Sequence, residues 1–164
     1  MLQNLPLVTS LAQQFRPGAF FSRQSTGGVS PTTGHLLDGD AWNFFFTFPQ
    51  GSQTGVDVWA VYNDGHITCS PDFNAPRTWA SVNIAPHVLL DSPAAFALAM
   101  GYGLADCVAA RPEGILRLGY TLEHRIGATV PIIRITVVGT GGQDLGEYVI
   151  SPSTGELYFK AYFC

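Results

Sequence analysis

A short pattern typical of a β-hairpin occurs twice in this chain of 164 residues, with the two copies 90 positions apart. Each copy has a run of strand-forming residues, a polar turn with a glycine, and a return to apolar sequence. The first copy covers residues 58–67 and turns at Gly65, whereas the second covers residues 148–157 and turns at Gly155. Because a tight turn fixes which strands are neighbours, the recurrence predicts two similarly built halves.

Each hairpin follows a predicted helix, and the two helices are also offset by 90 positions. The first helix is expected over residues 3–13, where Leu7 and Leu11 begin an apolar stripe that continues to Phe15. The second is expected over residues 93–103, after an Asp-Ser-Pro sequence that suits a helix start. Since this second helix is apolar on nearly all sides, we expect it to be deeply covered.

Apolar residues at every second position predict most of the strands. The strand-like ranges are 42–48, 56–62, 66–70, 116–122, 133–137, 147–150 and 157–163, with an edge strand over 79–84. Short turns join most of these ranges, so the sheet is predicted to be antiparallel. The segment from Pro17 to Asp40 is rich in Gly, Ser, Thr and Pro. There we expect only a short strand over 19–22, followed by an irregular loop.

These elements together predict a fold of the α+β class. We expect tandem αβββ units that form an antiparallel, curved, cystatin-like sheet with the helices packed on one face. A chain of this length can bury a sizeable core. We therefore treat residues 1–164 as a single domain made of two pseudo-repeats, 1–85 and 86–164.

The composition narrows the range of partners. Charged residues make up 12% of the chain, against about 25% in an average soluble domain, and Lys160 is the single lysine. With a net charge of −4, the chain lacks the basic face that nucleic-acid binding requires. We expect no nucleic-acid partner. A weakly charged, aromatic-rich surface favours association, so a protein or peptide partner and a homodimer are the candidates.

The cysteine pattern and the N-terminal sequence are relevant to the cellular compartment of the protein. The three cysteines form no CxxC pair, so we expect Cys69 and Cys107 to be small buried side chains. Cys164 is either free or bridges two chains. No apolar run approaches the roughly 20 residues of a membrane span, so no transmembrane segment is predicted. Without a leader-like N-terminus, the protein is expected in the cytoplasm if Met1 is the native start, and in the envelope or outside the cell if a leader was removed.

A helix opening at 91–95, a strand sequence at 131–135 and a final hairpin at 148–150 with its turn at 153–157 make the second half similar to a PepSY-type domain. In that family, a helix precedes a three-stranded sheet. Residues 42–67 look like a diverged first copy. The resemblance implies a non-catalytic role in binding or in peptidase inhibition, often in the cell envelope, and it implies no catalytic residues.

The sequence departs from the family pattern after Pro131, where members of the family commonly have a tryptophan. Ile132 stands at that place in the second half, and Trp42 holds the corresponding slot in the first half.

No pattern of catalytic or metal-binding residues is present. The four histidines have no zinc-ligand spacing, and no GxSxG sequence occurs; the histidines are His35, His66, His87 and His124. We therefore predict no catalytic residue, no metal site and no cofactor. The one candidate acid–base pair is His35 with the nearby Asp38 or Asp40.

The aromatic residues give the best functional indication. Trp42, Phe44, Phe46 and Phe48 share one face of a predicted strand, whereas Phe45 and Trp59 point to the opposite face of the sheet. Those two side chains are either covered by a second layer or exposed as a binding surface. A dimer partner or the 17–40 segment is the expected cover. The predicted binding residues are Trp59, Phe45 and Trp79.

The leading hypothesis is therefore a non-catalytic binding or inhibitory module that contacts a protein or peptide partner through an aromatic sheet surface. One alternative is a small cone-shaped α+β enzyme or small-molecule binder with a His–Asp pocket. Another is an immunity or chaperone-like partner protein.

Overall fold

A computed structural model of the chain describes residues 2–48, 56–63, 65–73, 79–111 and 113–162. Its strands form one eight-stranded antiparallel sheet in the order β4-β3-β2-β1-β5-β6-β7-β8. The strands are β1 (Phe20–Val29), β2 (Trp42–Thr47), β3 (Val56–Asn63), β4 (His66–Phe73), β5 (Ile115–Glu123), β6 (Ile132–Gly139), β7 (Asp144–Ile150) and β8 (Leu157–Tyr162). The fold is thus α+β with an antiparallel sheet, as the sequence predicts.

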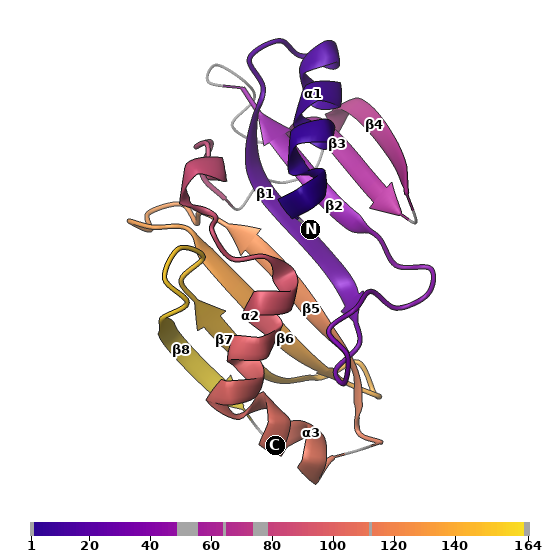
Figure 1. Cartoon of the computed structure of the whole chain (residues 1–164), viewed down its shortest axis with the longest axis vertical. Coiled ribbons are helices and arrows are strands. Elements are labelled where there is room, and N and C mark those ends of the chain that lie inside the picture. The colour runs from indigo at the N-terminus through magenta and orange to yellow at the C-terminus, as the bar shows by residue number, and fades with distance from the viewer. Residues whose placement is uncertain (1, 49–55, 64, 74–78, 112, 163–164) are drawn as a thin grey trace.

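The helices lie on one face of this sheet (Figure 1). They are α1 (Leu5–Phe15), α2 (Ser92–Ala99), a π-helical segment (Met100–Leu104) and α3 (Ala105–Ala110), with short 3-10 turns at Leu2–Asn4 and Ala85–His87. Helix α1 covers the β1–β4 half, and α2 covers the β5–β8 half. The main core lies between helices and sheet. We call this side the helix face and the opposite side of the sheet the open face.

Strand β1 is longer than the sequence predicts. The expected short strand over 19–22 is wrong, because β1 continues through residues expected to be loop and ends at Val29. Gln24 and Thr26 are buried there although they are polar. Strand propensity depends on the neighbouring strands, and β1 pairs with β2 on one side and β5 on the other. A turn closed by Ser30 N–H donating to the carbonyl of His35 follows.

Helix α1 buries a different stripe from the one expected. Val8 and Ala12 are fully buried, whereas Leu7 is 56% and Phe15 is 47% exposed. The two stripes differ by one residue, which is about 100° around a helix. The stripe with the smaller side chains is the one that faces the sheet.

The second helical region extends beyond the predicted 93–103 range and is kinked. Asp91 caps it, with its carboxylate accepting the Ser92 N–H at 2.7 Å. A positive φ of 115° at Gly103 interrupts the helical geometry. The expectation of deep cover is wrong, because α2 buries only Ser92, Ala95 and Ala99.

The same region includes a helical run long and apolar enough for a membrane span, although no such run was predicted from the sequence. On length and composition alone, the run Ser92–Ala110 is sufficient to cross a membrane, and 22% of it is buried. A helix that packs on the core of a globular fold meets the same criterion.

Both glycine turns join adjacent antiparallel strands, which confirms the predicted hairpins. Gly65 has φ +81° and Gly155 has φ +79°, a region that favours glycine. The expected edge strand over 79–84 is wrong, because Trp79 forms only an isolated bridge with Arg125.

Cys107 is buried, as the sequence predicts, whereas Cys69 is only partly buried. Cys107 is disulfide-bonded and Cys69 is a free thiol. Partial burial raises the pKa of the Cys69 thiol, which leaves it mostly protonated at neutral pH and weakly nucleophilic. The residue Cys164 lies outside the described part of the chain.

Leu118→Ala is expected to destabilise the protein strongly, because Leu118 is 1% exposed in the core. Truncating a buried leucine typically costs about 2–5 kcal/mol. Leu116→Ala is the matched control on the same strand. A bulge between Ile115 and Arg117 leaves Leu116 48% exposed, so its loss should change stability by less than about 0.5 kcal/mol. Urea unfolding measures both, and equal effects would contradict the assignment of faces.

The two hairpin glycines should respond differently to alanine. In Gly155→Ala, the new Cβ would lie 2.8 Å from Leu98 Cδ1 of α2, whereas in Gly65→Ala it would meet nothing within 4 Å. Both variants incur the backbone cost of positive φ, about 1–2 kcal/mol. We expect Gly155→Ala to be the more destabilising of the two by thermal unfolding. Equal losses would indicate that the β7–β8 turn does not pack against α2.

Candidate functional site

The open face carries one row of cross-strand neighbours that passes through the middle of the sheet. Trp59 on β3 pairs with Phe45 on β2, Phe45 pairs with Arg23 on β1, and Arg23 pairs with Glu123 on β5. The row therefore changes from aromatic to charged where the two halves of the sheet meet. Side chains opposite one another on a sheet face are in contact range.

The three predicted binding residues Trp59, Phe45 and Trp79 form one cluster on this face. The rings of Phe45 and Trp79 have centroids 5.4 Å apart. Phe45 is 8% and Trp79 is 2% exposed, while Trp59 is half-buried. Trp79, from the segment between β4 and α2, thus provides cover that was expected from residues 17–40 or from a dimer partner. Trp59 is the member with surface left for a partner.

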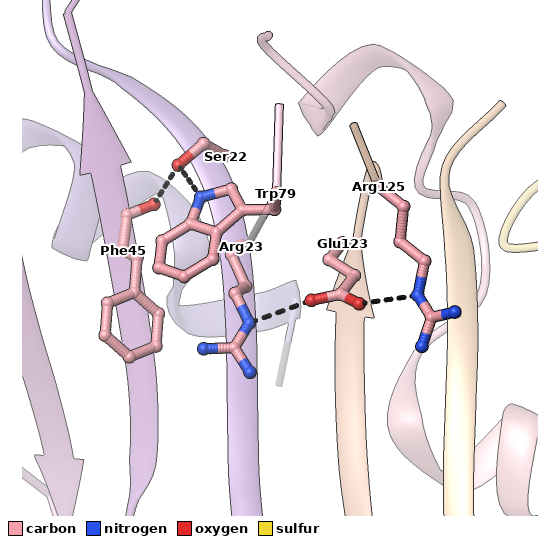
Figure 2. Close-up of polar contacts among 6 residues, drawn as sticks. All are labelled: Ser22, Arg23, Phe45, Trp79, Glu123 and Arg125. Carbon is pink, nitrogen blue, oxygen red and sulfur yellow. Dashed lines mark hydrogen bonds and ion pairs between the residues drawn. The ribbon is translucent and has the colours of Figure 1, made fainter. Parts of the chain in front are cut away.

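Trp79 is held in place by Ser22. The hydroxyl of Ser22 donates to the carbonyl of Phe45 at 3.0 Å and accepts the indole N–H of Trp79 at 3.1 Å (Figure 2). The β1–β2 register shifts between Phe21 and Arg23, which leaves Ser22 as the extra residue of a bulge. This bulge brings a fully buried hydroxyl to the indole of Trp79.

The same cluster fixes the side chain of Arg23. Its guanidinium carbon lies 4.7 Å from the centroid of the Trp79 ring and 5.2 Å from that of Phe45. A cation over an aromatic face is attracted by the ring quadrupole, and Arg is well suited to such stacking. Arg23 therefore belongs to the aromatic cluster and to the charged group beyond it.

Glu123 is the centre of the charged group. Its side chain is 7% exposed, and its two oxygens accept from different arginines (Figure 2). Oε2 accepts from Arg23 Nε at 3.1 Å, and Oε1 accepts from Arg125 Nε at 3.3 Å. A buried carboxylate requires such charge-assisted hydrogen bonds to offset its lost hydration. The end of β5 therefore holds a buried, paired carboxylate.

A further arginine lies on the next strand. Arg134 on β6 forms an ion pair of 3.4 Å with Glu147 on β7. Two open hollows in the surface share Arg134 as a lining residue. The first, which we call the arginine hollow, is lined by Arg23, Thr121, Glu123, Arg125, Ile126 and Arg134. The second is lined by Arg134, Thr136, Asp144, Gly146, Glu147 and Ala161.

The histidines are not gathered at this site. His35, His66 and His87 are exposed, and no ion pair with a carboxylate is found for any of the four within the described ranges. In that part of the chain no group of three or more His, Cys, Asp or Glu residues is arranged to hold a metal ion. The suggested pair of His35 with Asp38 or Asp40 therefore does not form among these residues.

A second group of polar side chains lies inside the core, on the helix face. Gln24 is fully buried and Tyr120 is 4% exposed. Burial raises the pKa of Tyr120, and the nearby carboxylate of Asp91 adds to that shift. Tyr120 thus remains a neutral phenol at physiological pH and is a poor proton acceptor.

Sequence reasoning found the aromatic part of this site and missed the charged part. The alternation in β5 and β6 puts Thr121, Glu123 and Arg134 on the face opposite the buried apolar residues. That signal could have suggested a charged patch. Arg23 carried no comparable signal, because the sequence did not predict a strand that extends beyond residue 22.

Comparison with known proteins identifies no relative: no family model matches the chain, and neither a curated protein nor a solved structure resembles it significantly.

Ser22→Ala should destabilise the fold by about 1–3 kcal/mol, because it removes the only hydroxyl that contacts the buried Trp79 N–H within the described residues. Ser25→Ala, a half-buried position on the same strand, should have a much smaller effect. Urea unfolding compares the two variants. A Ser22 variant as stable as the control would show that the Ser22–Trp79 contact contributes little to the fold.

Proposed function

We propose that this chain is a non-catalytic binding or inhibitory module whose open face receives a peptide segment of a protein partner. The observation that carries the proposal is the arginine hollow together with the partly exposed Trp59, which belongs to the same cross-strand row as Arg23. Arginine and tryptophan are enriched among the residues that dominate binding energy at protein interfaces. Strands hold most of these side chains, so little order has to be gained when a partner binds.

We further propose that the fold consists of tandem units with a curved, cystatin-like sheet, and that it is related to PepSY-type domains. In each half a helix precedes four sequentially paired strands, and the halves join through β1 and β5. This common order supports two pseudo-repeats, 1–85 and 86–164, with four strands in each unit in place of the three expected. The order helix, then antiparallel hairpins, is also that of the PepSY-type resemblance.

The disulfide at Cys107 bears on where such a module acts. Disulfides persist in oxidising compartments and are rare in the cytosol. Of the two compartments considered from the sequence, this favours the cell envelope or the exterior. A homodimer remains a separate proposal, supported by the weakly charged and aromatic-rich composition.

Selection of peptides from a random display library on the immobilised protein tests the binding proposal. We expect binders whose affinity falls about tenfold or more in Trp59→Ala, because large aromatic anchors dominate peptide interfaces. Fluorescence anisotropy measures the affinities, and circular dichroism checks that the variant is folded.

Tyr158→Ala is the matched control for this experiment. Tyr158 is 45% exposed on β8, the edge strand at the other end of the sheet from β3 and β4, so it lies far from Trp59. We expect its loss to leave peptide affinity unchanged. Failure to select any binder, or equal losses in the two variants, would overturn the proposal.

A further inference from the structure

We infer that the arginine hollow binds a carboxylate group, with its guanidinium groups as the hydrogen-bond donors. The inference deepens the proposed function and rests on it, since the carboxylate would belong to the peptide partner. Three arginines from three strands or strand ends converge there: Arg23 from β1, Arg125 just after β5, and Arg134 from β6. The chain has only eight basic residues in all, so this concentration is unusual for it.

The donor geometry suits a second carboxylate beside the one already present. Arg23 and Arg125 contact Glu123 through Nε, which is one of the five N–H donors of a guanidinium group. Figure 2 shows the two arginines on either side of Glu123, with their terminal nitrogens directed away from its carboxylate. These terminal N–H groups are the donors that planar carboxylates engage in pairs.

The charges of the hollow favour a single carboxylate over a phosphate. Arg23, Arg125 and Arg134 provide three positive charges. Glu123 in the lining provides one negative charge, and Glu147, the ion-pair partner of Arg134 just outside the lining, provides a second. One net positive charge remains, which one carboxylate neutralises. A phosphate monoester carries a charge of about −1.5 to −2 at pH 7 and would meet repulsion from both glutamates.

The arginines are also partly ordered before a ligand arrives. The side chains of Arg23 and Arg134 are each 23% exposed, and the guanidinium of Arg23 lies over the rings of both Phe45 and Trp79. Holding a long side chain in its binding geometry removes part of the entropy cost of complex formation. Partial burial also reduces the screening of the charges by salt. Ile126, 68% exposed at the rim, offers an apolar contact beside the carboxylate.

Nuclear magnetic resonance of the arginine Nε–H groups tests the inference on the whole chain. Sodium N-acetylglycinate represents the C-terminal carboxylate of a peptide, N-acetylglutamate α-amide represents a side-chain carboxylate, and methyl phosphate is the competing anion. Sodium chloride at the same ionic strength is the blank. We expect saturable shifts of the Arg23, Arg125 and Arg134 signals with at least one carboxylate, and weaker binding of methyl phosphate. The tighter of the two carboxylates identifies the source.

The matched variants are Arg125→Gln and Arg117→Gln. Both remove one positive charge from an exposed arginine, but Arg117 lies on β5 outside the lining of the hollow. We expect carboxylate affinity to fall about tenfold or more in Arg125→Gln and to stay unchanged in Arg117→Gln. Arg134→Gln serves as a second variant within the hollow. Shifts that do not saturate, equal losses in Arg117→Gln, or tighter binding of methyl phosphate would each overturn the inference.

The peptides selected in the display experiment separate this inference from the proposed function. If they bind with an affinity that depends on Trp59 but not on Arg125 or Arg134, the binding module stands and the carboxylate site is wrong. If N-acetylated carboxylates saturate the hollow while no peptide is selected, the carboxylate site stands and the peptide-binding function is wrong.

Discussion

The pairing of β1 with both β2 and β5 is the constraint on which the rest of the structure depends. Without it, the first four strands and the last four would be separate small sheets, each with additional exposed edges. On the open face, the hydrogen bond from Arg23 to Glu123 crosses this junction and joins residues 100 positions apart. Glu123 also accepts from Arg125, so an almost fully buried carboxylate is compensated from both sides. Removing one partner of such a group is costly because the remaining charge stays buried.

The junction also determines what each face of the sheet does. Helices α1 and α2 both lie on the helix face, where the apolar residues of all the central strands collect. Within the part of the chain that the structure describes, the open face has no helical layer, and its only large apolar cover is Trp79 on Phe45. Because Trp79 comes from the segment that leads from the first half to the second, the connection itself closes the aromatic cluster. The bulge at Ser22 supplies the polar contact that makes this closure specific.

Aromatic and charged groups meet at Arg23, which stacks on the first and pairs with the second. A row of cross-strand neighbours therefore runs from the partly exposed Trp59 through the buried Phe45 to Arg23, which lines the arginine hollow. Strands and their ends carry its charged residues, and packing fixes their directions better than in a mobile loop. The chain has only eight Lys and Arg residues, so the rest of the described surface has few groups that compete for an anion. This scarcity supports the arginine hollow as the place where an anion binds.

The sequence by itself determined the features that depend on near neighbours. Alternation at every second position predicted most strands, and Gly65 and Gly155 marked the hairpins because positive φ favours glycine. It also indicated that Phe45 and Trp59 point away from the main core. Only the tertiary structure decided the length of β1, the buried stripe of α1 and the position of Trp79. The ion pairs of Glu123 were likewise decided only by the tertiary structure. These depend on contacts between residues far apart in the chain, and such contacts leave no local pattern, because a strand or helix takes its buried face from whatever packs against it.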